Sequence, residues 1–315
     1  ALAVASVGIC MTETVPRVST SSGETAVPST GMAPSDRTPS DRTPADRTTL
    51  GTEQVTAEAA RLDGAERART QVKQSTELFP AMTIDDAYQV QKAWEQIKLD
   101  RGESLIGHKI GLTSKAMQAV MNIDTPDSGF LTNTMAFEDG AEIEAAAFTD
   151  AQIETELAFV LSDDLDSPDV TLFDVLNATD YVVPALELIA ARTFRTDPDT
   201  GRTRTVVDTI ADNAANGAII TGGRPVKPND VDLRWVGALL SRNGAIEESG
   251  VAAAVLNHPA KGIVWLARRY AEQGMTLRRG QIILAGSFTR PVRLSAGDVF
   301  HADYGALGAF SVRFT

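Results

Sequence analysis

The residue pattern of the chain changes at Leu105, and this change limits the possible folds more than any other feature. After it, short apolar segments are separated by Gly, Pro and Asn, which is typical of β-rich domains. Strict alternation of strands and helices is missing, so the pattern predicts an α+β fold with a mixed or antiparallel sheet. The predicted strands are 154–161, 217–221, 281–285 and 309–314, and the predicted helices are 172–178, 233–240 and 259–273.

The residues before this point divide into two sections. Residues 53–104 are predicted to be helical, because Thr83 suits an N-cap with Asp86 three positions later, and apolar residues then recur at helical spacing. Residues 11–52 are dominated by Ser, Thr, Pro and Gly and repeat the pattern P-[SA]-D-R-T. Such a segment buries too little apolar surface to offset its chain entropy. We therefore expect a disordered tail at 1–52 and a folded domain at 53–315, with its β-rich, metal-binding core at 105–315, and full stability in a chain that starts at Glu53.

Charge and cysteine content exclude several classes of protein. The net charge of −13 and the pI near 4.7 argue against nucleic-acid and anionic-membrane partners, because a negative field repels polyanions. The apolar opening stretch, residues 1–9, lacks a basic segment and is too short to span a membrane. The single cysteine, Cys10, rules out an internal disulfide framework. These features predict a protein of the reducing cytoplasm.

The clearest chemical signal is the pair Glu154 and Glu156 in the predicted strand 154–161. Alternate side chains of a strand share one face, and this face continues through Ala158 and Val160. The two carboxylates would then stand where a polar rim meets an apolar interior. Like charges in such a place need a cation or a proton, whereas a simple solvated face is the alternative interpretation.

Glu187 supports the metal interpretation, because it is the only charged residue of the apolar run 182–190. A buried, unpaired carboxylate is unfavourable, so Glu187 either joins the pair at a metal ion or forms a salt bridge with Arg192 or another base. Three carboxylates without a nearby His or Cys favour Mg²⁺ or Mn²⁺ over zinc.

The segment GHKIGLTSK at 107–115 places His108 and Lys109 between glycines. Glycine allows close approach of the backbone to a ligand, and Lys109 offers a cation to an acidic substrate. A phosphate-binding loop and a G-x-S-x-G elbow are both missing, and Ser287 has no evident base, so neither a nucleotide site nor a serine hydrolase is indicated. We interpret His258 and His301 as structural.

From about Leu62 to Thr315 the chain resembles the 2-oxo-enoate hydratases of the fumarylacetoacetate hydrolase superfamily. The resemblance implies a mixed β-sheet roll with peripheral helices, assembled into homo-oligomers. The motifs that carry it are GHKIGLTSKAMQ (107–118), IETELAFVL (153–161), LFDVLNATDYVVPALELI (172–189), DTIADNAAN (208–216), GVAAAVLNHPAKGIVWLA (250–267), GQIILAGSFTRPV (280–292) and FHADYGALGAFSVRF (300–314).

The same resemblance implies roles for particular residues. It makes Glu154, Glu156 and Glu187 the metal ligands, and it places Lys109 and Asp127 in the active site as the catalytic residues. One departure is visible, because close relatives usually carry P-D-Y-G where this chain has P-D-S-G at 126–129. The missing tyrosine bears on the packing of the loop 121–135.

The implied reaction is addition of water to a small 2-oxo-enoic acid of aromatic-compound catabolism, with the metal chelating the C1 carboxylate and the C2 oxygen. The matches at 250–267 and 280–292 favour members that act on 2-oxohept-4-ene-1,7-dioate. The second carboxylate of this dioate would meet a cation. Arg192 and Arg290 are the candidates, unless they partner acidic side chains, and His108 and Ser287 are further candidate substrate contacts.

Other functions remain open within and beyond this group. The sister reactions are decarboxylation of 2-oxo-3-hexenedioate and hydration of 2-hydroxypentadienoate, which fold and metal do not distinguish. Acylpyruvate hydrolysis is the alternative from another class, but it usually needs a His-Glu dyad that is not evident here. A non-catalytic companion of another enzyme is disfavoured by the presence of all three carboxylates.

Overall fold

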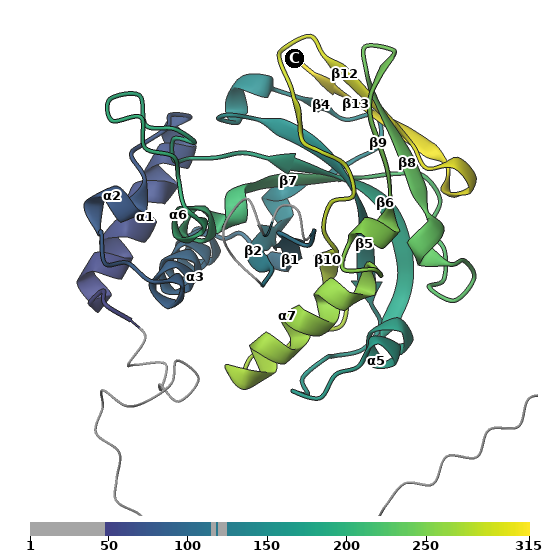
Figure 1. Cartoon of the computed structure of the whole chain (residues 1–315), viewed down its shortest axis with the longest axis horizontal. Coiled ribbons are helices and arrows are strands. Elements are labelled where there is room, and N and C mark those ends of the chain that lie inside the picture. The colour runs from purple at the N-terminus through teal and green to yellow at the C-terminus, as the bar shows by residue number, and fades with distance from the viewer. Residues whose placement is uncertain (1–47, 115–117, 119–124) are drawn as a thin grey trace, which may run out of the picture. The chain divides into compact units, whose positions relative to one another are not determined.

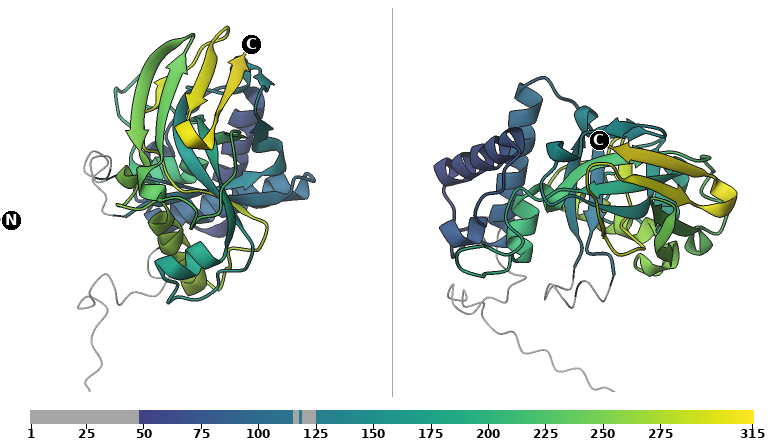
Figure 2. Two further views of the ribbon diagram at one scale, coloured as in Figure 1. Left: turned by 90° about the vertical axis from the view of Figure 1, so that its right-hand side faces the viewer. Right: turned by 90° about the horizontal axis from the view of Figure 1, so that it is seen from above.

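The computed structural model describes residues 48–114, 118 and 125–315. This part of the chain contains a helical N-terminal section and two β-sheets. Figures 1 and 2 show the N-terminal helices on one side of the molecule and the C-terminal strands, in yellow, on the other. The tail expected at 1–52 lies outside the described residues as far as position 47.

The N-terminal section is helical, as the sequence predicts, and consists of three helices. The last one begins with the expected capping arrangement: the Asp86 N–H donates to the Thr83 hydroxyl at 3.2 Å, and the Asp86 carboxylate accepts from the Thr83 N–H at 2.8 Å. Leu62 and Trp94 are fully buried where the two long helices pack together. The helices are α1 (Thr52–Ala68), α2 (Ser75–Leu78) and α3 (Ile84–Asp100).

The ordered contacts begin before residue 53, where the sequence places the start of the folded domain. The Thr49 and Leu50 N–H groups donate to Asp86 Oδ1 at 2.9 and 3.0 Å. Leu50 also packs against the apolar core of the helical section. In the structure, contacts with the helical section therefore extend before the expected boundary at 52/53, because Asp86 accepts hydrogen bonds from Thr49 and Leu50 in addition to those of the capping box.

The larger sheet has the strand order β2-β1-β10-β5-β6-β7-β3, with β11 paired to β5. The β1–β10 and β3–β7 pairs are parallel and the others are antiparallel, which confirms the predicted mixed sheet. Strands β5, β7 and β10 correspond to three predicted strands. The strands are β1 (Leu105–Gly111), β2 (Asp127–Thr132), β3 (Ala136–Glu138), β5 (Gln152–Leu161), β6 (Thr179–Ile189), β7 (Asn216–Thr221), β10 (Ile282–Leu284) and β11 (Val292–Arg293).

This sheet curls into a roll, as the family resemblance implies. The side chains of Asn213 and Asn216 donate to the Phe130 carbonyl on β2 at 3.1 and 2.9 Å. Asn216 is the first residue of β7, so these bonds join strands that lie far apart in the strand order. The roll therefore brings β1, β2, β5 and β6 around one interior.

The smaller sheet has the order β4-β13-β12-β8-β9 and packs against the larger one. The predicted strand at 309–314 is confirmed as β13. The helix predicted at 233–240 is wrong, because only 233–235 form a helical turn and the strand β8 follows. Burial alternates along β8, so that Leu240 is buried in the core and Leu239 is exposed to solvent. The strands are β4 (Glu142–Ile143), β8 (Gly237–Arg242), β9 (Ala245–Val251), β12 (Val299–Asp303) and β13 (Ala309–Phe314).

The remaining helices cover the sheets or cap their ends. Helix α7 (Figure 1) confirms the helix predicted at 259–273. It packs Ile263 and Leu266 into the core that the two sheets share. No helix in the described ranges is long and apolar enough to cross a membrane. The α-helices are α5 (Leu172–Asn177), α6 (Val206–Ala211) and α7 (Ala260–Glu272). The short 3₁₀ helices are η4 (Asn133–Met135), η5 (Ala145–Ala147), η6 (Asn213–Ala215), η7 (Leu233–Trp235), η8 (Ala252–Ala254) and η9 (Gly305–Leu307).

Candidate metal centre

Glu154, Glu156 and Glu187 converge on one face of the β5–β6 ladder. Glu154 and Glu187 are direct register partners, and Glu156 lies two residues further along β5 on the same face. One carboxylate oxygen from each residue lies within 4.8 Å of the others. Glu156 and Glu187 are buried, each with 1% exposure, and Glu154 is partly exposed. The convergence that the sequence predicts is present in the structure.

The strand pattern explains why the glutamates share this face. Leu157 and Phe159 of β5 point the other way, into the core between the two sheets, whereas Ala158 belongs to the apolar cluster of the helical section. A slip of one residue in register would place the carboxylates in the core and expose the large apolar side chains. Burial of Leu157 and Phe159 therefore fixes the position of the acidic residues.

The local electrostatics favour a cation. Burial, reinforced by the charge of Glu187, raises the pKa of Glu154 to about 8 and that of Glu156 well above its usual range. The Gly286 N–H donates to Glu156 Oε2 at 2.8 Å, whereas Glu187 Oε1 forms an ion pair with Lys109 and makes no hydrogen bond in the described part of the chain. A cluster of carboxylate oxygens without His or Cys fits a hard ion such as Mg²⁺ or Mn²⁺.

Lys109 enters the same site from β1. Its Nζ lies 3.2 Å from Glu187 Oε1. Burial alone would lower the pKa of Lys109, but the charges of Glu187, Asp127 and the other two glutamates outweigh this effect and raise the pKa above its ordinary value. Lys109 therefore remains an ammonium ion, and one ammonium does not balance four surrounding carboxyl groups.

Asp127, the first residue of β2, is the register partner of Gly111 on β1. Its Oδ1 is buried without a hydrogen-bond partner in the described part of the chain. Burial raises the pKa of Asp127, and the charge of Lys109 opposes this effect. A Cβ at Gly111 would lie 2.3 Å from Asp127 Oδ1 and 3.0 Å from Lys109 Nζ, so only glycine lets the two side chains approach here.

Ser128, which stands where close relatives usually carry tyrosine, lies on the same strand. Its side chain is buried, and its carbonyl accepts a hydrogen bond from Gln91 of α3 at 2.8 Å. The loop that the sequence marks at 121–135 is described only from 125 onward, and 121–124 lie outside the described residues. In the described part, β2 thus keeps its backbone contact with the helical section.

Two other candidate contacts have different positions. Ser287 lies beside Glu154, where its hydroxyl helps to lower the pKa of that carboxyl, and it also donates to the Thr289 carbonyl at 2.9 Å. His108 does not point into the site, because it precedes Lys109 on β1 and faces the opposite side. Its Nδ1 lies 3.1 Å from the Tyr270 hydroxyl on α7, and burial lowers its pKa to about 4. The expectation that His108 contacts substrate is therefore corrected.

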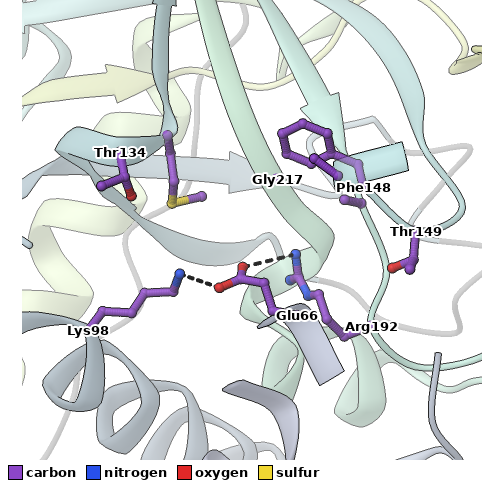
Figure 3. A pocket seen from close by; sticks show the side chains of 10 residues that line it. Glu66, Lys98, Thr134, Phe148, Thr149, Arg192 and Gly217 are labelled. Carbon is purple, nitrogen blue, oxygen red and sulfur yellow. Dashed lines mark hydrogen bonds and ion pairs between the residues drawn. The ribbon is translucent and has the colours of Figure 1, made fainter. Parts of the chain in front are cut away.

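Arg192 is not free to bind substrate. It is 2% exposed, its Nε donates to Asp212 Oδ1 at 2.6 Å, and its Nη1 donates to the Asn216 carbonyl at 2.8 Å. Figure 3 shows it beside Glu66, which also pairs with Lys98, in a pocket of about 150 Å³. Arg192 thus joins α1 and α3 to the core, as the alternative interpretation of a structural partner allows.

Arg290 lies on the surface, which corrects the second expected cation. Its side chain is 84% exposed and pairs with Glu248 at 2.7 Å. His258 and His301 also have structural contacts, since Nδ1 of His258 accepts from the Ala260 N–H at 3.2 Å and Nδ1 of His301 lies 2.9 Å from the Ser311 hydroxyl. None of these three side chains is among the groups that meet at the carboxylate cluster.

Sequence reasoning missed Gly286 and Tyr304, both of which contact Glu156. The Tyr304 hydroxyl reaches the Glu156 backbone from the other sheet. Gly286 has a φ of +114°, and a Cβ there would lie 2.3 Å from Thr113 Oγ1. The motif 280–292 contains Gly286, but no local pattern signals that either residue supports a carboxylate far away in the sequence.

Comparison with known proteins identifies the family. Residues 106–315 match the family described as fumarylacetoacetate (FAA) hydrolase C-terminal. The chain belongs to the fumarylacetoacetate hydrolase family. The matched region contains all three glutamates, Lys109 and Asp127.

Similar family members include several enzymes of known name. The chain is 56% identical to the 2-oxo-hept-4-ene-1,7-dioate hydratase of Escherichia coli over 82% of this chain and 97% of that protein. It is 37% identical to a 2-keto-4-pentenoate hydratase of Paraburkholderia xenovorans over 84% and 96% of the two chains. The structure of 4-oxalocrotonate decarboxylase from Pseudomonas putida G7, complexed with magnesium and adipate, superposes with a TM-score of 0.81 at 36% identity and covers 85% of this chain and 100% of that one.

Proposed function

We propose that the chain is a metal-dependent hydratase that adds water to 2-oxohept-4-ene-1,7-dioate and yields the 4-hydroxy-2-oxo acid. The observation that carries the proposal is the convergence of Glu154, Glu156 and Glu187 within 4.8 Å in a buried setting. The 56% identity to a hydratase of this name, over nearly the whole of that protein, supports the choice of substrate.

The three glutamates would hold Mg²⁺ or Mn²⁺. Their oxygens suit a hard cation, and the raised pKa values of Glu154 and Glu156 reflect the unfavourable charge that such a cation would balance. The magnesium in the related decarboxylase structure supports the same choice. When bound, the ion supplies Lewis-acid polarisation of the 2-oxo acid end of the substrate.

Lys109 and Asp127 would have different roles in the reaction, one in substrate binding and the other in proton transfer or water orientation. Lys109 remains protonated and therefore acts as a fixed cation that holds an anionic oxygen of the substrate, not as a proton acceptor. Asp127 is buried beside it with a raised pKa and a free carboxylate oxygen, so it can take up and release a proton or orient the attacking water. Gly111 keeps the two groups in close proximity.

Decarboxylation is the main alternative, because a 4-oxalocrotonate decarboxylase of Pseudomonas putida is 37% identical over 84% of this chain. The higher identity to the dioate hydratase favours hydration. Acylpyruvate hydrolysis through a His-Glu dyad is disfavoured, since His108 faces away from the glutamates and the other histidines lie elsewhere.

We also propose that the protein forms homo-oligomers. Trp235, Leu239 and Val251 are 75%, 44% and 41% exposed, and they line one groove of about 750 Å³ on the smaller sheet. Exposed apolar patches of this kind mark interaction surfaces. Sedimentation velocity of the wild type and of Trp235→Ser tests the proposal, with a smaller species expected for the variant.

The reaction is tested with purified protein, Mg²⁺ and the seven-carbon dioate. Hydration predicts loss of ultraviolet absorbance and a product heavier by one water, whereas release of CO₂ or of two fragments would indicate decarboxylation or hydrolysis. Glu154→Gln and Glu187→Gln are expected to lose metal uptake and activity while they remain folded. Glu142→Gln is the matched control, because Glu142 is 70% exposed on β4. Full activity of either ligand variant in a chelating buffer would contradict the metal site.

A further inference from the structure

Four arginines, Arg192, Arg195, Arg202 and Arg204, lie on the segment that connects β6 to α6. This segment folds back on itself, with the Arg204 N–H donating to the Arg195 carbonyl at 3.0 Å and a β-bridge between Thr196 and Thr203. It follows the strand that carries Glu187, and Arg192 stands at its start. The segment that carries these arginines is therefore the direct continuation of β6, a strand of the candidate metal centre.

Two of these arginines already have carboxylate partners. Arg192 is bound to Asp212, whose other oxygen accepts from the Arg192 and Thr193 N–H groups at 2.8 and 2.9 Å. Arg195 is bound to Asp150, with Nε at 3.0 Å and Nη2 at 2.9 Å from Oδ2. The remaining oxygen of Asp150 accepts from Arg293 at 2.9 Å. Asp212 and Asp150 are thus both occupied by other arginines.

Of the other two arginines, Arg202 is exposed and donates to the Thr76 hydroxyl at 2.8 Å, and Arg204 is partly buried without an ion pair in the described part of the chain. The Nη1 of Arg204 is buried and has no hydrogen-bond partner among the described residues. Burial and the neighbouring Arg195 and Arg192 all act against its charge, and Asp212 and Asp150 only partly offset them. A desolvated guanidinium in this situation is unfavourable unless an anionic ligand binds it.

The position of Arg204 relates it to the proposed active site. Its N–H is bonded to the carbonyl of Arg195, and the Arg195 guanidinium is bound to Asp150, which lies just before the start of β5, the strand that carries Glu154. In agreement with this position, the charge of Arg204 acts to lower the pKa of Asp127, and the charge of Arg195 acts to lower that of Glu154. Arg195 is held by Asp150, whereas Arg204 has a free donor. Arg204 is thus the arginine of this segment that, among the described residues, combines a buried free donor with the lack of a carboxylate partner.

We propose that Arg204 binds the second carboxylate of the substrate, the one remote from the 2-oxo acid group. The inference rests on the proposed function and replaces Arg192 and Arg290, the first buried against Asp212 and the second on the surface. A guanidinium binds a carboxylate through parallel N–H donors, which gives both affinity and orientation. Arg204 would thereby favour binding of a 2-oxo dioate over the corresponding 2-oxo monoacid.

The test compares two saturated probes that differ only in the distal group, 2-oxoheptanedioate and 2-oxoheptanoate. Their affinities are measured by isothermal titration calorimetry with the Mg²⁺-loaded protein. The wild type is expected to bind the dioate about 10- to 100-fold more tightly, the effect of one charge-assisted contact. Arg204→Met should remove this preference and leave the monoacid unchanged, whereas Arg290→Ala should keep the wild-type preference.

Thermal unfolding separates binding from a structural role. Without ligand, Arg204→Met should melt at or above the wild-type midpoint, because it removes an uncompensated cation. Retention of the dioate preference in this variant would overturn the proposal. A lower midpoint with equal weakening of both probes would also overturn it, since Arg204 would then support the fold. If the wild type binds neither probe in the presence of Mg²⁺, the proposed function itself fails.

Discussion

The hydroxyl of Tyr304 is hydrogen-bonded to the backbone of Glu156 from the opposite sheet. It accepts from the Glu156 N–H at 3.2 Å and donates toward the carbonyls of Glu156 at 3.0 Å and Ala185 at 2.5 Å. The phenol ring is buried, stacked on Phe310 and in edge contact with Phe288. Tyr304 therefore joins the smaller sheet to the β5–β6 ladder at the point where Glu156 enters the candidate metal site.

Tyr304→Phe should weaken both stability and metal binding. Loss of the hydroxyl leaves buried backbone groups of Glu156 and Ala185 unsatisfied, at a cost of about 1–3 kcal/mol in the free energy of unfolding. Urea unfolding measures this change, and calorimetric titration with Mg²⁺ or Mn²⁺ measures the affinity. Tyr181→Phe is the control, because Tyr181 is 36% exposed. Unchanged metal affinity in Tyr304→Phe would mean that Glu156 is positioned without this contact.

Gly111→Ala should abolish activity and leave most of the stability intact. The new methyl group would lie 2.3 Å from Asp127 Oδ1 and would separate Asp127 from Lys109. Because Gly111 is at the end of β1, the strand itself can persist. Steady-state kinetics and the thermal midpoint are measured together. Gly64→Ala, where a Cβ meets nothing within 4 Å, is the control and should gain up to about 1 kcal/mol in α1. Wild-type turnover of Gly111→Ala would exclude a joint role of Lys109 and Asp127.

The metal-free protein should lose stability as the pH rises from about 5 to 9. The pKa of Glu154 is about 8 in the folded state against an ordinary value of 4.5, so the native state binds more protons than the unfolded state between these values. The protonated carboxyl of Glu154 therefore contributes to the free energy of unfolding below pH 4.5, and this contribution is lost as the pH rises past 8. Thermal midpoints are measured in EDTA as a function of pH. The Glu154→Gln variant is the comparison, because it lacks the titrating carboxyl and should show a smaller decrease of the midpoint with pH. A wild-type slope equal to that of the variant would contradict the raised pKa.

Much of the candidate site follows from local sequence pattern. The alternation of β5 places Glu154 and Glu156 on one face, and the apolar run around Glu187 predicts a buried carboxylate that needs a partner. These inferences succeed because strand periodicity and burial are local properties. The capping signal at Thr83 and Asp86 succeeds for the same reason.

The remaining features depend on contacts between distant parts of the chain. Arg192 and Arg290 follow segments that carry site residues, but tertiary packing directs one to Asp212 and the other to solvent. The apolar pattern at 233–240 suits a helix, yet pairing with β9 and β12 makes its second half, from Gly237 onward, a strand. Tyr304 is 148 residues from Glu156, and no spacing in the sequence indicates that they meet.

The start of the folded domain gives a further prediction. The sequence suggests that a chain beginning at Glu53 keeps full stability, but the structure predicts otherwise, because Thr49 and Leu50 donate their N–H groups to the buried Asp86. These bonds help to lower the pKa of Asp86 against the opposing effect of burial. Removal of residues 1–52 should therefore cost about 1–3 kcal/mol in the free energy of unfolding.

A chain that begins at Thr48 is the matched control, since it retains every one of these contacts and should unfold at the full-length midpoint. Urea unfolding of the two shortened chains at neutral pH measures the difference between them. Asp86 also accepts from the Thr83 N–H at 2.8 Å, so α3 itself should persist in both, and far-ultraviolet circular dichroism should remain unchanged. Equal midpoints for the two chains would show that the capping box alone satisfies Asp86, and that the folded domain does begin at Glu53.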